Sequence, residues 1–392
     1  MKHKFFITPF IAVIILSMIF LASQIPTAKV APKNLPIAFV NEDQGEMSTT
    51  LAAKLLENAP EAIQFVEYDS VQEMEEGMNE RETYAGFVIP ESFSTQFASL
   101  QTEAPEQAVI QIYLNEGYNT SVATTAETML QKIVGQLSGT VSEQMTTQLA
   151  QAAEQMKQQA AGNEQLAAMI SPVKPEMVSL LANPITSETV KVNPAGDLAS
   201  VPMGLFTSVW MSSLLGAMLF YMAGNQKKEP TLKEQRTNQL VQFLLPIMYS
   251  LFAGYAITLL ATWILGYDFA SFNAVAITLT ISVLGFTYLV LALLKLVGIA
   301  IVPVFGILMF FGLPLIQMAP EMIPSFYRDF VLPWLPMRFL IDALKEVVFF
   351  GNSVFNPYTI VLIWIAVVSA IVLLIRNAFL NKRLKAKILS QS

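Results

Sequence analysis

Chemically reactive side chains are scarce in this sequence. It has no cysteine and one histidine, His3, near its start. Thiolate nucleophiles, thiolate or histidine metal sites and Ser/His/Asp triads are therefore excluded. No G-x-x-x-x-G-K-[ST] segment occurs, so the chain has no P-loop for the phosphates of ATP. We expect a protein that is not an enzyme and that binds no cofactor and no metal.

One charged segment suits docking of a partner. Residues 224–239 form a predicted loop in which Pro230 favours the start of a short helix. The segment is either a solvated connector or a docking helix for a cytoplasmic protein. Its charged residues are Lys227, Lys228, Glu229, Lys233, Glu234 and Arg236.

A second charged segment is amphipathic. At 100° per residue from Pro336 onward, Arg338, Asp342 and Lys345 share one helix face. The opposite face is apolar, and Arg338 can pair with Asp342 at i, i+4. This helix lies in the predicted loop 317–357, where Pro333 and its neighbours favour re-entrant or interfacial elements over another span. Trp334 would hold the loop at the level of the lipid headgroups.

The elements that must position these residues are membrane helices. The composition is 54% hydrophobic and 14% charged, and the mean hydropathy is +0.50. A bilayer core about 30 Å thick needs roughly 20 apolar residues in a helix. Six uncharged runs of suitable length occur, at 5–22, 198–226, 237–267, 269–294, 296–320 and 356–375. We predict an uncleaved N-terminal transmembrane helix within residues 1–24 and five helices within residues 201–381.

Polar residues within these runs either line a path or join neighbouring helices. Lys295, the only charge between the fourth and fifth runs, is expected at a tight turn from which it reaches the headgroups. The uncharged candidates are Ser212, Ser213, Gln242, Tyr249 and Tyr255.

Charge sets the expected orientation. Lys and Arg concentrate in one alternating set of flanks, including the 224–239 loop and a basic tail at 382–392. Residues 25–200 instead hold eight Lys and Arg against 23 Asp and Glu. We predict a multi-pass protein of the cell membrane with both termini in the cytoplasm and residues 25–200 outside. The negative net charge and pI near 5.0 argue against a nucleic-acid partner.

The external segment is expected to fold as an α/β domain. Residues 34–118 alternate β-branched runs with helical stretches, which predicts strands at 35–40, 63–68, 84–89 and 109–114. Helices are predicted at 47–59 and 70–81. Residues 119–170 lack proline and predict a helical arm, either packed on the α/β unit or used for dimerisation or substrate shaping. Residues 171–200, rich in proline, are predicted to be a linker.

Two segments resemble a known family. WLPMRFLIDALKEVVFFGN (334–352) resembles the segment before the last membrane helix of ABC-2 type transporter permeases. The order of one helix, an external domain and five further helices resembles theirs too. LPIAFVNEDQG (35–45) is similar to the opening of the YhgE/Pip (phage infection protein) branch. The helical arm here spans only residues 119–170, so roles of that branch that need a longer external coiled coil are not expected.

The resemblance implies a function and partners. The chain would be the permease subunit of an ABC-type exporter of an amphiphilic or lipid-like compound, a peptide or a drug. It would form a homodimer or a heterodimer with a related permease in the bilayer and use a separate ATPase. Residues 227–236 would couple to that ATPase, and residues 323–350 would close the outer side of the path. The alternatives are a non-transporting scaffold or receptor, and an exporter driven by an ion gradient.

Overall fold

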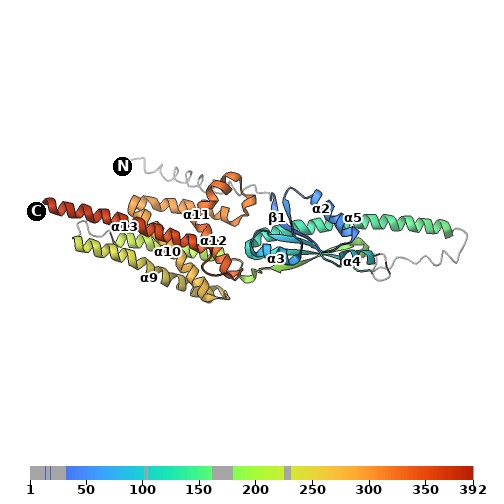
Figure 1. The fold of residues 1–392 in the computed structure, drawn as a ribbon, viewed down its shortest axis with the longest axis horizontal. Helices are drawn as coiled ribbons and strands as arrows, with labels where there is room; N and C mark the ends of the chain where they lie inside the picture. The colour runs from blue at the N-terminus through green and yellow to red at the C-terminus, as the bar shows by residue number, and fades with distance from the viewer. Residues whose placement is uncertain are drawn as a thin grey trace. The chain divides into compact units, whose positions relative to one another are not determined.

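The computed structural model describes residues 14, 18, 32–100, 102, 105–160, 180–224 and 231–391. It divides into two compact units (Figure 1). The α/β unit is Ala31–Pro194, and the bundle unit combines Met1–Val30 with Ala195–Ser392. The apolar run at 5–22, predicted to be the first membrane helix, lies outside the described residues except at Ile14 and Met18.

The α/β unit is built on a five-stranded sheet of order β2-β1-β3-β4-β5. Parallel pairing joins β1 to both β2 and β3, β4 runs antiparallel to β3, and β5 runs parallel to β4. The strands are β1 (Leu35–Asn41), β2 (Ile63–Glu67), β3 (Ala85–Ile89), β4 (Ala108–Asn115) and β5 (Ile185–Val192).

The first four strands confirm the predicted strand positions to within about one residue. The fifth is a correction, because residues 171–200 were predicted to be a linker. Eight residues of that segment pair with β4 along their whole length, from Ala108↔Ile185 to Asn115↔Val192. Pairing satisfies the backbone groups of β5 that face β4, and β5 forms the outer strand of the sheet.

Helices cover both faces of the sheet. α3 (Val71–Asn79) packs Met74 and Met78 against Ala38, Val40 and Val88. α5 (Glu116–Ala160) lies on the opposite face, because its Glu116 pairs with Lys191, whereas Val190 and Val192 pack with the α3 cluster. α2 (Glu46–Glu57) and α3 confirm the helices predicted at 47–59 and 70–81. α4 (Phe93–Ser99) was not predicted.

α5 confirms that residues 119–160 are helical and that the helix packs on the sheet. Asn119 has extended backbone angles, and its Oδ1 accepts a hydrogen bond from the N–H of Val122, so the regular helix begins after it. Ala123, Ala126 and Leu130 are fully buried. Residues 161–170 of the predicted arm lie outside the described residues.

The turn after β1 is fixed by a buried carboxylate. Asp43 is 4% exposed, and its Oδ1 accepts hydrogen bonds from the N–H of Gly45 (2.6 Å) and the hydroxyl of Ser48 (3.0 Å). Its Oδ2 accepts from the N–H of Ser94 at 2.5 Å. One side chain therefore holds the N-terminal ends of both α2 and α4. Burial acts to raise the pKa of Asp43, but the N–H groups of Ser94 and Gly45 outweigh it and keep the pKa below its ordinary value.

The lowered pKa predicts a pH dependence of the α/β unit. Its carboxylate contributes stability above the unfolded pKa, near 3.9, and that contribution is lost as pH falls through the lower folded value. Asp43→Asn should cost about 2 kcal/mol at pH 7 and flatten the loss of stability on acidification below about pH 4. Urea unfolding of residues 31–194, followed by circular dichroism, measures both effects. Asp69→Asn, at an exposed position, is the control. If the free energy of unfolding of the Asp43 variant and that of the wild type change with pH in parallel, Asp43 does not have the lowered pKa.

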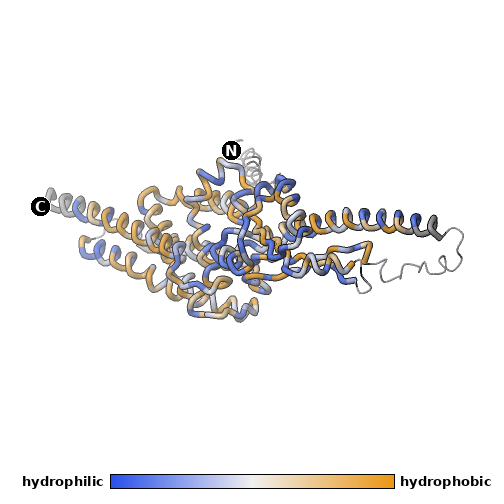
Figure 2. Tube along the Cα trace, turned by 45° about the vertical axis from the view of Figure 1, so that its right-hand side comes forward, coloured by the Kyte–Doolittle hydropathy of each residue, from blue (hydrophilic) through white to orange (hydrophobic). Residues whose placement is uncertain are grey.

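The bundle unit consists of long apolar helices. Five described helices are long and apolar enough to cross a membrane. Figure 2 shows their predominantly hydrophobic colouring, against the more hydrophilic α/β unit. They are α8 (Val201–Ala223), α9 (Leu232–Leu265), α10 (Phe272–Val297), α11 (Val302–Gln317) and α13 (Pro357–Gln391). They agree with five of the six predicted spans.

α10 is the central helix of the bundle. In its most apolar window 67% of residues are buried, against 22–39% in the other four helices. It packs on α8, α9 and α13. Three of its hydroxyl side chains, those of Thr278, Thr280 and Ser282, donate to carbonyls one turn earlier, at 2.7–2.9 Å. These bonds satisfy the three hydroxyls within the helix, whereas the buried hydroxyl of Thr287 has no partner among the described residues.

Glycine allows the closest helix contacts. A Cβ at Gly254 of α9 would lie 2.2 Å from Oγ1 and 2.6 Å from the backbone nitrogen of Thr280 in α10. A Cβ at Gly285 of α10 would lie 3.0 Å from the carbonyl oxygen of Leu362 in α13. Small residues at such points let helix backbones approach, which is how helices associate in membranes.

Candidate functional site

The described end of the charged segment predicted to dock a partner is the start of a long apolar helix. α9 begins at Leu232, with Thr231 as its N-cap and Glu234 completing a capping box. Lys233, Glu234 and Arg236 therefore lie in its first turns, and the side chains of Lys233 and Arg236 are exposed. The predicted separate short helix beginning at Pro230 is wrong, because α9 continues without a break to Leu265. Lys227, Lys228 and Glu229 lie outside the described residues.

The first turns of α9 are fastened to α13 by an amide side chain. The Oδ1 of Asn381 accepts a hydrogen bond from Nε2 of Gln235 at 2.9 Å. Its Nδ2 donates to Oε1 of Gln239 at 2.8 Å. We call these three residues the Asn381 clamp. Sequence reasoning missed it, because the amides lie more than 140 residues apart and only the fold brings them together.

Two of the five uncharged candidates within the spans, Tyr249 and Gln242, bond to a neighbouring helix. The hydroxyl of Tyr249 in α9 donates to the carbonyl of Ser212 in α8 at 2.8 Å, and Nε2 of Gln242 donates to the carbonyl of Phe220 at 2.8 Å. The hydroxyls of Ser212 and the fully buried Ser213 both donate to the carbonyl of Val209 in their own helix. The contacts of Tyr249 and Gln242 join α9 to α8, whereas the two serine hydroxyls bond within α8.

Tyr255 is the most open of these candidates. It is 36% exposed, and its ring packs at 6.3 Å from that of Phe272 at the start of α10. Lys295 lies in the last turn of α10, just before Gly298, whose φ of +86° ends the helix. The predicted turn at Lys295 is therefore present.

The predicted amphipathic helix before the last span is α12 (Pro336–Val348). Its buried residues include Leu340, Ile341, Leu344 and Val347, as predicted. The charged face forms a small ionic network, in which Asp342 contacts Nε of Arg338 at 3.3 Å and Nζ of Lys345 at 3.8 Å. The network is partly buried, with the side chain of Asp342 15% exposed.

The segment before α12 is a chain of short helical turns. Tyr327–Val331 is a π-helix and Leu332–Trp334, which includes Pro333, is a 3-10 helix. Phe326, Phe330 and Trp334 are 62%, 70% and 57% exposed, and Nε1 of Trp334 donates to the carbonyl of Phe330 at 2.6 Å. An exposed aromatic row of this kind suits a membrane interface.

Glu346 is a site residue that the sequence analysis missed. It is 9% exposed, and its Oε2 accepts a hydrogen bond from Nδ2 of Asn352 at 2.5 Å. The carbonyl of Glu346 also accepts from the N–H of Asn352. These bonds fix the chain between α12 and α13. Periodicity gave no signal for this burial, because at 100° per residue Glu346 lies about 40° from Asp342, on the charged side of the helix.

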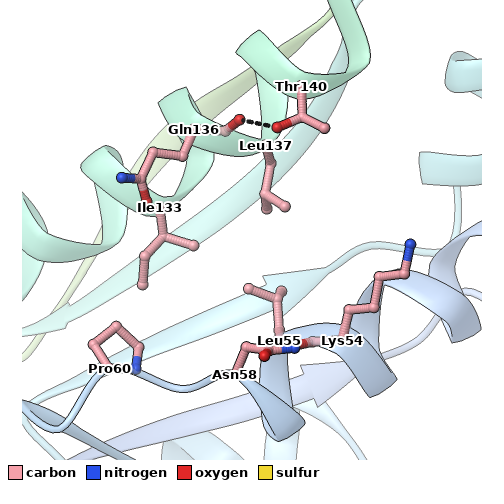
Figure 3. Close-up of a pocket in the computed structure, with 8 residues that line it drawn as sticks. All are labelled: Lys54, Leu55, Asn58, Pro60, Ile133, Gln136, Leu137 and Thr140. Carbon is pink, nitrogen blue, oxygen red and sulfur yellow. Dashed lines mark hydrogen bonds between the residues drawn. The ribbon is translucent and has the colours of Figure 1, made fainter. Parts of the chain in front are cut away.

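The α/β unit has a groove between α2 and α5 (Figure 3). Leu55 of α2 points across it toward Ile133 and Leu137 of α5. The volume is about 260 Å³, and Lys54, Asn58, Pro60, Gln136 and Thr140 also line it. Its floor is apolar and its rim largely polar. In the described part of the chain, no group of three or more His, Asp or Glu residues could hold a metal ion.

Comparison with known proteins identifies the family. The family model described as ABC-2 family transporter protein matches residues 4–375, nearly the whole chain. Comparisons with curated proteins and with solved structures gave no significant match. The match takes in the α/β unit, α8 to α12 and the first part of α13. The chain is thus a multi-pass membrane protein and belongs to the ABC-2 family of transporter proteins.

Proposed function

We propose that the chain is the permease subunit of an ABC-type exporter that moves an amphiphilic or lipid-like compound, a peptide or a drug across the cell membrane. A separate ATPase subunit supplies the energy, and the permease pairs with a second copy or a related chain. The family match supports a membrane permease of an ABC transporter. The resemblance of residues 35–45 supports the YhgE/Pip-like branch within it.

The proposed topology has six membrane helices, with both termini in the cytoplasm and residues 25–200 outside the cell. It rests on charge, because residues 25–200 hold 23 Asp and Glu against eight Lys and Arg. In this topology the end of the bundle where α8 ends and α9 begins, here called the α8–α9 end, faces the cytoplasm. The amphipathic α12 lies toward the outer side.

The Asn381 clamp is the observation that carries the proposal. An ATPase that docks on the exposed Lys233 and Arg236 contacts the first turns of α9, and the clamp transmits any movement of those turns to α13. α13 packs along the central α10 and against α12. A displacement at the cytoplasmic end can thus reach the segment proposed to close the outer side of the path.

An affinity purification from native membranes tests the proposal. The full chain, extracted in mild detergent, should retain an ATPase with a P-loop, and the eluate should hydrolyse ATP. Substituting Lys233, Glu234 and Arg236 together by alanine should reduce the retained ATPase at least tenfold, because charged contacts at a docking surface are lost.

The matched control changes neighbouring exposed positions of the same helix, Thr237 and Asn238, to alanine. This variant should keep its ATPase. If both the wild type and the control variant purify in a stable complex that contains no ATPase, the proposal is overturned and a scaffold or receptor role is favoured.

A further inference from the structure

The two halves of α9 are held to the bundle in different ways. From Leu232 to Leu245, at the α8–α9 end, every residue is exposed or half-buried. The buried residues of the helix all lie at or after its internal proline, and they are Pro246, Ser250, Ala253, Gly254, Thr258 and Ala261. The second half therefore meets its neighbours by close packing, and the first half must be held by other contacts.

Side-chain hydrogen bonds hold the first half. The Asn381 clamp joins it to α13. Nε2 of Gln242 donates to the carbonyl of Phe220 in α8, and the hydroxyl of Tyr288 in α10 donates to the carbonyl of Phe243. A single hydrogen bond contributes modestly to net stability, so these contacts can be broken without unpacking a core.

Close packing fixes the second half. A Cβ at Gly254 would lie 2.6 Å from the backbone nitrogen of Thr280 in α10. On the side of α8, a Cβ at Gly216 would lie 2.6 Å from Cε1 of Tyr249, and the Tyr249 hydroxyl donates to the carbonyl of Ser212. Because interiors packed at this density yield little, a shift of this half would bring atoms of neighbouring helices into collision.

Pro246 lies where the two kinds of contact meet. Proline has no N–H, so the carbonyl of Gln242 loses the donor that a helix supplies from four residues later, and the proline ring crowds that carbonyl. Sharp bends in helices are almost always found at such points. The backbone stays helical through Pro246. Its weakest step thus coincides with the boundary between the hydrogen-bonded half and the packed half.

We propose that residues 232–245 form a lever that pivots at Pro246 while residues 247–265 stay fixed to α8 and α10. A change of about 20° in the bend moves Lys233, roughly 20 Å away along the helix, by about 7 Å. The lever deepens the proposed function, on which its role in transport rests. An ATPase bound to the exposed charges of α9 moves the lever and, through the Asn381 clamp, α13, without disturbing the packed second half.

Pulsed electron spin resonance on the purified full chain, without an ATPase, tests the lever. One spin label is attached to a cysteine introduced at Leu296 in α10, and the other to a cysteine at Lys233 or Trp263 of α9, all exposed positions. The release variant combines Asn381→Leu with Tyr288→Phe and so removes the bonds to α13 and α10. It should widen the distance distribution between the labels at 233 and 296 by about 7 Å and leave that between 263 and 296 unchanged.

Removing the proline tests the position of the pivot. Pro246→Ala, added to the release variant, should abolish most of the widening, because alanine restores the N–H that bonds to the carbonyl of Gln242. Pro314→Ala is the matched control, since Pro314 also lies inside a helix of the bundle, α11. This control should leave the widening unchanged.

Three results would overturn the proposal. Equal widening of both distributions would show that α9 moves as one rod. Unchanged distributions in the release variant would show that the first half is fixed without its hydrogen bonds. Widening that Pro246→Ala does not reduce would place the pivot elsewhere. All three concern the chain alone, so they are distinguishable from a loss of ATPase in the affinity purification, which would overturn the proposed function instead.

Discussion

Gly254→Leu should prevent the bundle unit from reaching its native packing. A Cβ at position 254 would lie 2.2 Å from Oγ1 of Thr280, 2.6 Å from its backbone nitrogen and 2.7 Å from the carbonyl oxygen of Ala276. Two of these atoms belong to the backbone of α10, the central helix, so no rotamer change relieves the clash. We expect a loss of at least about 3 kcal/mol, the upper range for overpacking. Size-exclusion profiles and thermal unfolding in detergent measure it.

Gly306→Leu in α11 is the matched control. A Cβ at position 306 would have no described atom within 4 Å, so this variant should elute and unfold like the wild type. Gly254→Ala should fall between the two. Equal behaviour of the leucine variants at 254 and 306 would show that α9 and α10 do not pack through Gly254.

Asn381→Leu should uncouple the cytoplasmic segment from the last helix. The leucine side chain is similar in size but removes both the acceptor used by Gln235 and the donor used by Gln239. If each hydrogen bond contributes about 1 kcal/mol, the equilibrium constant between the clamped and unclamped arrangements of α9 and α13 falls about 30-fold. The ATPase should still bind the exposed charges of α9 and hydrolyse ATP, while transport falls by a similar factor.

The absence of cysteine makes this prediction directly measurable. Cysteines introduced at the exposed positions Asn238 and Lys382 can carry spin labels, and pulsed electron spin resonance gives their distance distribution. The distribution should be narrow in the wild-type background and broad with Asn381→Leu. Gln239→Met removes one bond only and should give an intermediate width. A narrow distribution in the leucine variant would contradict the role of the clamp.

Strong periodicity and long apolar runs made much of the fold predictable. The apolar runs that form α8, α9, α10, α11 and α13 are too long and too apolar for helices of a water-soluble domain. The amphipathic pattern from Pro336 correctly gave the buried face of α12. The strand β5 escaped notice because Ser187, Glu188 and Lys191 make its pattern polar, as is usual for a strand at the edge of a sheet.

The candidate site was less predictable, because its contacts join distant parts of the chain. Charge and proline placement identified the 224–239 segment, but propensity alone could not show that α9 continues through it. The partners of Asn381 depend on which helices pack together. Hydropathy cannot rank the spans by burial, so the central position of α10 emerged only from the fold.

The sheet topology of the α/β unit also bears on how the protein can be rebuilt. β5 runs opposite to β1, since β3 and β4 are the one antiparallel pair among the described strands. The start of β1 and the end of β5 therefore lie at the same end of the strands, where the chain enters and leaves the unit. Domains with neighbouring ends behave as insertions. The α/β unit therefore has the layout of an inserted domain. Replacing or shortening the segment between residues 31 and 194 should leave the fold of the helices after it intact.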